Sequence, residues 1–202
     1  MADTLPLVAE PALQRLSQQT TLYLQQTSSG YNGSNFSVFG EDEELILNLN
    51  EIVPDTFFRG GARRPFQFNG EDSAGKKLFT FGRAKSRWII KNKVELFMDD
   101  ALISVVRLAR TCCTPIFNIS DGLDNPMFRL KGRAANISYF QLQTNDKIAI
   151  GEIQKKSRGW KKEMFSFKDN YVISVPEDLA VNLKIAVLAA CVYIDFRFHE
   201  GR

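Results

Sequence analysis

The sequence predicts a mainly β fold, namely a closed twelve-stranded antiparallel barrel around a central apolar α-helix near the C-terminus. The first observation is a repeat of short alternating segments and turns, spaced by roughly 20 residues, from residue 20 to residue 175. The second is a single apolar segment that follows Pro176-Glu177-Asp178. A barrel of about twelve strands has an interior that its own side chains cannot fill, and a helix that is apolar all round must be surrounded. The two observations therefore support each other.

Twelve strands are expected in sequential hairpins. The turns between hairpin partners carry Asp, Asn or Gly, which supply positive φ angles or side-chain turn bonds. Hairpins added side by side form an antiparallel meander, and closure of the meander removes its exposed edges. The expected strands are 20–26, 35–39, 45–50, 65–69, 77–82, 94–98, 103–109, 115–120, 127–132, 137–143, 148–155 and 170–175.

The apolar segment is expected to form a core helix at about 178–199. Pro176 and the acidic residues after it are typical of a helix start. The uninterrupted apolar part, 185–194, would rise only about 15 Å as a helix, whereas a bilayer core is about 30 Å thick. A buried helix is therefore favoured over a membrane span. The residues expected in the core are Leu183, Val187, Cys191, Ile194 and Phe198.

The chain is expected to form one domain. Its 202 residues are 44% hydrophobic, which is enough for one substantial core. Residues 1–12 show no strand or helix pattern and are expected to be a flexible lead-in, which leaves 13–202 as the barrel domain. The three cysteines form no visible disulfide framework, and the N-terminus lacks the pattern of a secretory signal. A reducing compartment is therefore expected.

Basic residues are concentrated in one part of the sequence. The net charge of the chain is +3, but residues 59–93 contain ten basic and only two acidic residues. Such a stretch favours an anionic partner, either lipid headgroups or, as the less favoured choice, nucleic acid. The alternative is a solvated outer face of the strands. The candidate anion-binding residues here are Arg63, Arg64, Lys76, Lys77, Arg83, Lys85 and Arg87.

A second basic segment surrounds a tryptophan. An indole among basic side chains is suited to the interface of an anionic membrane. The alternative is the basic end of a hairpin that contacts no partner. The candidate residues are Lys155, Lys156, Arg158, Trp160, Lys161 and Lys162.

The sequence gives little support to catalysis. A nucleophilic triad needs a base beside a nucleophile, and the one histidine, His199, is expected to be an exposed residue at the helix end. No cysteine or histidine has zinc-ligand spacing, and no glycine-rich phosphate loop is present. A weak calcium site could use Asp169, Asn170 and Asp178, although calcium takes six to eight oxygen ligands. The alternative assigns Asp169 and Asn170 to a turn and Asp178 to a helix cap.

Three stretches of the chain resemble the phospholipid scramblase family, and together they extend over about residues 13–200. The first is Leu13-Gln14-Arg15-Leu16-Ser17-Gln18 with Gln25-Gln26, and the second is Gly151-Glu152-Ile153-Gln154-Lys155 with Gly159 and Glu163-Met164-Phe165. The third is the most specific. It contains Asp169-Asn170-Tyr171, Pro176, Asp178-Leu179, Lys184, Ala186-Val187, Ala190-Cys191, Ile194-Asp195-Phe196, Phe198 and Glu200.

The resemblance implies the tubby-like fold, in which a twelve-stranded barrel encloses a C-terminal helix. It also implies calcium-stimulated, energy-independent movement of phospholipids between membrane leaflets, or regulation of that movement, at the cytoplasmic face of the plasma membrane. The basic segment around Trp160 resembles a nuclear import signal of the family, so a cytosolic or nuclear pool is a further expectation. At one position of the calcium loop the chain departs from the family, because Phe167 stands where the family has an acidic residue.

Two further expectations concern anchoring and the class of function. Cys112 and Cys113 are candidates for acylation, because two acyl chains near Arg107 and Arg110 would anchor the chain stably. The alternative is a pair of cysteines at a strand end that only fill space. The alternative function is a non-enzymatic tubby-like adaptor, which binds anionic phospholipid or a protein or nucleic-acid partner without moving lipid.

Overall fold

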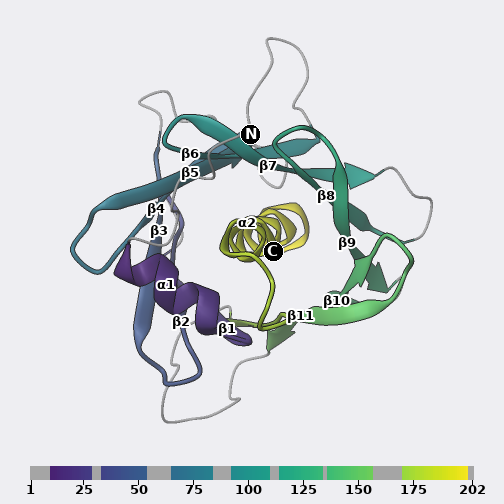
Figure 1. Cartoon of the computed structure of the whole chain (residues 1–202), viewed down its shortest axis with the longest axis horizontal. Coiled ribbons are helices and arrows are strands. Elements are labelled where there is room, and N and C mark those ends of the chain that lie inside the picture. The colour runs from purple at the N-terminus through teal and green to yellow at the C-terminus, as the bar shows by residue number, and fades with distance from the viewer. Residues whose placement is uncertain are drawn as a thin grey trace.

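The computed structural model describes residues 10–28, 33–53, 65–83, 92–109, 114–133, 136–156 and 170–199. Within these ranges the chain forms twelve strands and two helices, coloured along the sequence in Figure 1. The elements are α1 (Pro11–Gln18), β1 (Thr21–Ser28), β2 (Asn35–Phe39), β3 (Leu45–Glu51), β4 (Phe66–Glu71), β5 (Lys77–Arg83), β6 (Lys93–Met98), β7 (Ala101–Ala109), β8 (Ile116–Asp121), β9 (Pro126–Arg133), β10 (Asn136–Thr144), β11 (Ala149–Lys156), β12 (Asn170–Ser174) and α2 (Val181–Phe198).

The strands form a closed antiparallel barrel, as the sequence predicts. Each strand pairs with its neighbours in the sequence, and β12 closes the barrel by pairing with β1. Every predicted strand is present, with bounds that differ by at most two residues. Inward positions are apolar in alternation, for example Phe66, Phe68, Phe79 and Phe81 on β4 and β5, because neighbouring residues of a strand point to opposite faces.

The meander gives the barrel two distinct ends. Because successive strands are antiparallel, alternate connections lie at the same end. We call one end the hairpin end; it is formed by residues 40–44, 72–76, 99–100, 122–125, 145–148 and 175–180. The other, which we call the opposite end, is where the odd-numbered strands β1 to β11 and helix α2 finish.

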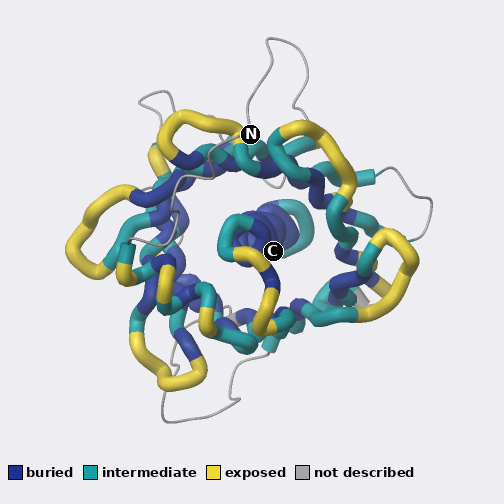
Figure 2. Tube along the Cα trace, viewed as in Figure 1, coloured by how far each residue is buried: buried dark blue, intermediate teal, exposed yellow. Residues whose placement is uncertain are grey.

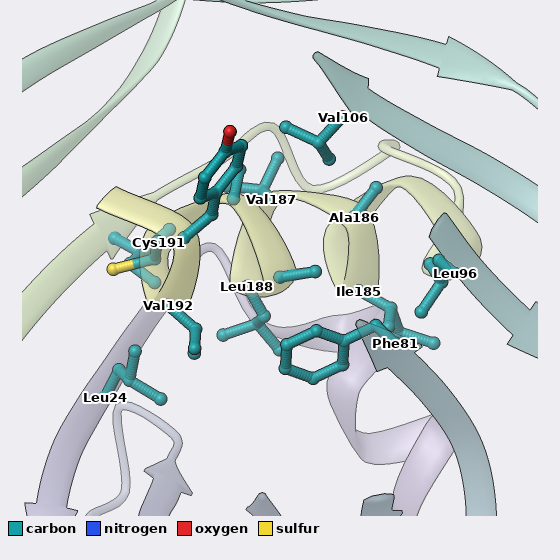
Figure 3. Packing of buried hydrophobic residues seen from close by; sticks show 14 of the residues in the cluster. Leu24, Phe81, Leu96, Val106, Ile185, Ala186, Val187, Leu188, Cys191 and Val192 are labelled. Atoms are coloured by element: carbon teal, nitrogen blue, oxygen red, sulfur yellow. The ribbon is translucent and has the colours of Figure 1, made fainter. Parts of the chain in front are cut away.

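Helix α2 runs through the centre of the barrel from the hairpin end to the opposite end (Figure 1). Its residues from Leu183 to Phe196 are all buried, which Figure 2 shows as a dark helix inside the ring of strands. Figure 3 shows how strand side chains surround it. The labelled strand residues there are Leu24, Phe81, Leu96 and Val106. The central apolar helix predicted from the sequence is therefore confirmed.

The five residues predicted to lie in the core do so. Leu183, Val187, Cys191 and Ile194 are buried, and Phe198 is partly buried against the same cluster. The helix begins at Val181 rather than near residue 178, because the chain first makes a turn in which the Leu179 amide donates to the Pro176 carbonyl.

Helix α1 was not predicted. It lies at the hairpin end, contacts α2 and β3, and buries Leu13 and Leu16. These two residues are three apart and therefore share one helix face. With only eight residues, such a helix is stable only through its contacts with the barrel. It is thus a cap on the hairpin end, and it begins at Pro11, within the segment expected to be a lead-in.

Candidate functional site

The apolar helix α2 carries a buried cation near its first turn. The Lys184 side chain is fully buried, and its Nζ donates to the carbonyl oxygens of Ser17 at 2.6 Å, Gln19 at 2.8 Å and Glu177 at 3.1 Å. Two of these carbonyls lie at the C-terminal end of α1, which is the negative end of that helix dipole. Desolvation lowers the pKa of Lys184, and the negative charges of Glu177 and Asp178 oppose this shift. Lys184 therefore fastens α1 and the turn before α2 to the helix.

The same helix carries a buried anion in its last turn. Asp195 is 2% exposed; its Oδ1 accepts a hydrogen bond from the Tyr171 hydroxyl at 2.6 Å and lies 3.5 Å from the Lys155 Nζ. The Lys155 ammonium also lies 5.4 Å from the centre of the Tyr171 ring. Because Tyr171 is on β12 and Lys155 on β11, this cluster fastens the end of α2 to the barrel wall.

Both charges stand at the end of α2 where its own dipole disfavours them. The first turn of a helix favours anions and the last turn favours cations, but α2 has Lys184 in its first turn and Asp195 in its last. Each charge is stable only because groups outside the helix neutralise it. The clusters around Lys184 and Asp195 therefore fix the helix in the barrel at both ends, a role that sequence analysis missed. Charged residues at the limits of an apolar run were the available signal.

The predicted basic residues of 59–93 that the structure describes do not form one face. Lys76 and Lys77 belong to the β4–β5 hairpin and lie at the hairpin end, whereas Arg83 ends β5 at the opposite end. A strand of seven residues separates these positions by about 20 Å. Lys76 also has a partner within the protein, because its Nζ donates a hydrogen bond to the Glu10 Oε1 at 2.5 Å. The three of these candidates that the structure describes therefore do not share a single surface, and anion binding by the stretch stays a prediction.

Two predicted anion-binding residues point into the protein. Arg83 is only 3% exposed, and its guanidinium carbon lies 5.4 Å from the centre of the Tyr193 ring. It follows Phe81 by two residues on β5, so strand alternation directs both side chains to the inside. Lys155 belongs to the Asp195 cluster described above. Neither side chain lies on a solvated outer face, which corrects that part of the prediction.

Lys156 lies on the barrel wall, and its Nζ bonds the Gln154 Oε1 at 2.5 Å. The remaining predicted basic residues and the tryptophan lie outside the described residues. These are Arg63, Arg64, Lys85, Arg87, Arg158, Trp160, Lys161 and Lys162. The two candidate acylation sites, Cys112 and Cys113, also lie outside them.

The two ends of the barrel nevertheless differ strongly in charge. The segments that form the hairpin end contain eleven acidic residues and two lysines. The strands at the opposite end are connected by residues 29–32, 54–64, 84–91, 110–113, 134–135 and 157–169, which lie outside the described residues. In the sequence these connections contain eleven basic and three acidic residues. Although the net charge of the chain is low, the hairpin end is therefore acidic, and the connections between the strands at the opposite end are basic in sequence.

The structure separates the two predicted calcium ligands that it describes. Asn170 begins β12 at the opposite end, whereas Asp178 is exposed in the turn after the strand, at the hairpin end. The strand alone separates them by about 13 Å, while calcium ligands lie within about 2.6 Å of the ion. Asp169 lies outside the described residues, within which no group of three acidic, cysteine or histidine side chains could hold a metal. Calcium binding stays a prediction.

His199 caps the C-terminus of α2 and is half-buried instead of exposed. Its ring centre lies 6.4 Å from that of Tyr171, next to the Asp195 cluster. Among the helices of the described ranges, neither has the length and apolar character needed to cross a membrane.

Comparison with solved structures supports the fold. The chain resembles a protein from Arabidopsis thaliana whose X-ray structure is known, with a TM-score of 0.51 and 14% sequence identity. The match covers 89% of this chain and 92% of that chain. At this identity the likeness concerns the fold alone.

Comparison with sequences identifies the family. The chain is 33% identical to human phospholipid scramblase 2 over 69% of its own length and 51% of that protein's, and 32% identical to rat phospholipid scramblase 1 over 69% and 45%. It is also 35% identical to bovine phospholipid scramblase 2 over 44% of its own length and 32% of that protein's. These matches therefore span a third to a half of the relatives. The sequence model of the Scramblase family matches residues 30–201, and the chain therefore belongs to the scramblase family.

Proposed function

We propose that this chain moves phospholipids between the two leaflets of a membrane without an energy source, or regulates that movement. Membership of the scramblase family over residues 30–201 carries this proposal. The partner is the anionic phospholipid surface, and the expected location is the cytoplasmic face of the plasma membrane. Calcium is proposed as a stimulating ion, and Cys112 and Cys113 as anchoring sites.

The charge difference between the two ends supports one orientation on the membrane. Anionic lipid attracts a basic segment by about 1 kcal/mol for each lysine or arginine near the surface, and it repels carboxylates in the same way. Ten of the eleven acidic residues at the hairpin end are exposed. We therefore propose that the opposite end, with its basic connections, faces the lipid and that the hairpin end faces water.

The enclosed helix favours a second candidate function. Passage of a polar headgroup needs a hydrophilic path through the hydrocarbon core, and α2 is apolar, buried and fixed at both ends by Lys184 and Asp195. Movement of lipid through this domain would require α2 to leave the barrel. An adaptor that binds anionic phospholipid without moving it requires no such change, and it is the second candidate.

A lipid-movement assay separates the two candidates. The purified chain is reconstituted into liposomes that carry fluorescent lipid in both leaflets, and dithionite is added with and without calcium. Bleaching beyond the outer half of the fluorescence is the result expected of a scramblase, and an increase with calcium is expected from the predicted ion. Bleaching that stops at half would reject lipid movement by the chain alone and leave the adaptor function.

A binding assay tests the orientation with two matched charge variants. K85Q/R87Q removes two positive charges from the connection between β5 and β6, and K76Q/K77Q removes two at the hairpin end. We expect the first variant to weaken binding to vesicles rich in anionic lipid about tenfold more than the second. Vesicle co-sedimentation measures both affinities. Equal losses, or a larger loss for K76Q/K77Q, would reject the proposed orientation.

A further inference from the structure

Three neighbouring turns at the hairpin end expose large aliphatic side chains. Leu123 is 85% exposed, Ile148 is 63% exposed and Leu102 is 37% exposed. They belong to the β8–β9, β10–β11 and β6–β7 hairpins, which follow one another around the barrel rim (Figures 1 and 2). Only one other large hydrophobic residue of the described ranges, Ile52, is exposed to this degree, and it lies beyond β3 at the opposite end. We call Leu102, Leu123 and Ile148 the hairpin patch.

The turn that carries Leu123 is held by its own hydrogen bonds. The Asp121 carboxylate accepts from the amides of Leu123 and Asn125 and from the Asn125 side chain, at 2.8–2.9 Å. These bonds keep Leu123 directed away from the barrel, since the turn cannot rearrange without losing them. Gly122 lies directly against the Leu102 backbone, where a Cβ would come within 2.0 Å of the carbonyl oxygen. Leu102 and Leu123 therefore come from one closely packed unit.

The turn that carries Ile148 is joined to the same unit. The Asn145 side chain donates to the Pro126 carbonyl at 2.9 Å, which links the β10–β11 turn to the start of β9. Within the β10–β11 turn, the Thr144 amide donates to the Ile148 carbonyl at 2.9 Å. A partner would thus meet side chains that are already in place, which reduces the entropic cost of binding.

The charges around the patch indicate the chemistry of the partner. The three turns and their borders contain Asp99, Asp100, Asp121, Asp124 and Asp146, and the basic residues near them include Lys147, Lys76, which is close enough to interact with Asp99, and Arg107, whose guanidinium pairs with Asp124. An anionic lipid surface would be repelled by this set of charges. A protein segment with lysines or arginines beside apolar residues would be complementary to it in both respects.

We propose that the hairpin patch is a docking surface for a basic, amphipathic protein segment. The apolar residues of the segment cover Leu123, Ile148 and Leu102, and its cations lie over the surrounding carboxylates. If the opposite end faces the membrane, the patch faces water and remains accessible to such a partner. The proposal does not require that the chain move lipid, so it can fail or succeed independently of the lipid-movement assay.

The test is a selection from a random 16-residue peptide library displayed on phage, against the folded chain. We expect enrichment of peptides that combine several basic residues with one or two large apolar residues. A synthetic copy of the best peptide is then measured by fluorescence anisotropy against wild-type protein and L123S/I148S. We expect affinity to fall at least about tenfold in that variant, because serine at both positions removes the apolar surface that the peptide would bury.

Two controls keep the result specific. I52S removes an exposed aliphatic side chain at the opposite end and should leave the affinity unchanged, whereas D100N/D146N should weaken binding at low salt and reduce its salt dependence. Circular dichroism confirms that each variant is folded. Failure to enrich basic peptides, or equal binding to wild-type protein and L123S/I148S, overturns the proposal.

Two other occupants of the patch would also contradict it. If sedimentation velocity shows that the chain self-associates through the patch, and L123S/I148S abolishes this, the occupant is a second copy. If L123S/I148S reduces binding to anionic vesicles, the patch is a membrane contact instead.

Discussion

At each end of the barrel a buried charge of α2 is neutralised, but the groups that neutralise it differ between the two ends. At the hairpin end, the buried Lys184 ammonium is neutralised by backbone carbonyls, two of which lie at the C-terminal end of α1. At the opposite end, the buried Asp195 carboxylate is neutralised by side chains of the wall, Tyr171 and Lys155. The hairpin end therefore depends on an added helix, whereas the opposite end depends on the strands themselves.

This difference indicates which end of the barrel can open most readily. Loss of α1 from the hairpin end would break the contacts of Lys184 with Ser17 and Gln19 but no strand pair of the barrel. Release of Asp195 would break its contact with Lys155 on β11 and the hydrogen bond that it accepts from Tyr171 on β12, two strands of the wall itself. Any movement of α2 out of the barrel is therefore expected to begin at the hairpin end.

The largest effect is expected on the rate at which Cys191 reacts with a thiol reagent. This residue lies at the centre of α2, between the two ends of the barrel. Cys191 is fully buried, and burial raises the pKa of its thiol well above the usual range. In a C112S/C113S variant, where Cys191 is the one remaining cysteine, reaction with a thiol reagent should be roughly a thousandfold or more slower in the native than in the unfolded protein. Absorbance stopped-flow measures both rates. Rapid labelling of the native protein would show that the barrel opens readily at both ends.

The second-largest effect is expected from Asp195→Ala at the opposite end. The substitution leaves the Lys155 ammonium and the Tyr171 hydroxyl without their buried acceptor, which should lower the free energy of unfolding by about 4 kcal/mol. Urea denaturation measures this change. Asp195→Asn is the control, because it removes the charge but keeps an acceptor for Tyr171 and should lose less. A loss below about 1 kcal/mol for Asp195→Ala would mean that the wall does not depend on this cluster.

A smaller effect is expected from Lys184→Met at the hairpin end. The change removes three hydrogen bonds from a charged donor, but it also removes the desolvated charge, so we expect a loss of about 2 kcal/mol. Hydrogen exchange should increase in α1, residues 11–18, more than in β11 and β12. The exposed Lys147→Met serves as the control. Equal increases at both ends of the barrel would show that Lys184 does not act mainly on the hairpin end.

The smallest effect is expected in how the free energy of unfolding depends on pH through Lys184, at the same end of the barrel. Because the pKa of Lys184 is lowered in the fold, the unfolded chain holds this proton more tightly than the native chain does. Wild-type stability should therefore rise, relative to Lys184→Met, as the pH increases from the lowered native pKa toward the pKa of an unperturbed lysine near 10.4. Urea denaturation of both proteins between pH 7 and pH 10 gives the difference. A difference that falls with pH would show that the carbonyls stabilise the ammonium more than burial disfavours it.

Much of the fold could be predicted from local sequence patterns. Alternation and turn residues are properties of a few neighbouring residues, so the twelve strands were located to within two residues. The core helix was recognisable because 185–194 is too short to span a bilayer and too apolar to face water. Helix α1 was not recognisable in the sequence, because its eight residues form a helix only against the barrel.

The candidate site was less predictable, for a geometric reason. Residues 59–93 are contiguous in the sequence, and their basic residues suggested one surface, yet β5 carries Lys77 to one end of the barrel and Arg83 to the other. Strand β12 likewise separates Asn170 from Asp178, which the sequence places only eight positions apart. Spacing along a strand increases distance by about 3.3 Å per residue, so proximity in sequence misleads where a strand intervenes.

The barrel, the enclosed helix and the resemblance to the scramblase family could be predicted from the sequence alone, because each depends on the order and type of residues along the chain. Which charges meet depends instead on the tertiary structure. It placed Lys184 against the end of α1, 165 residues away from Gln19, and Asp195 against two strands of the wall. It also gathered acidic turns and aliphatic residues from separate hairpins at one end, because closure of an antiparallel meander brings alternate connections together.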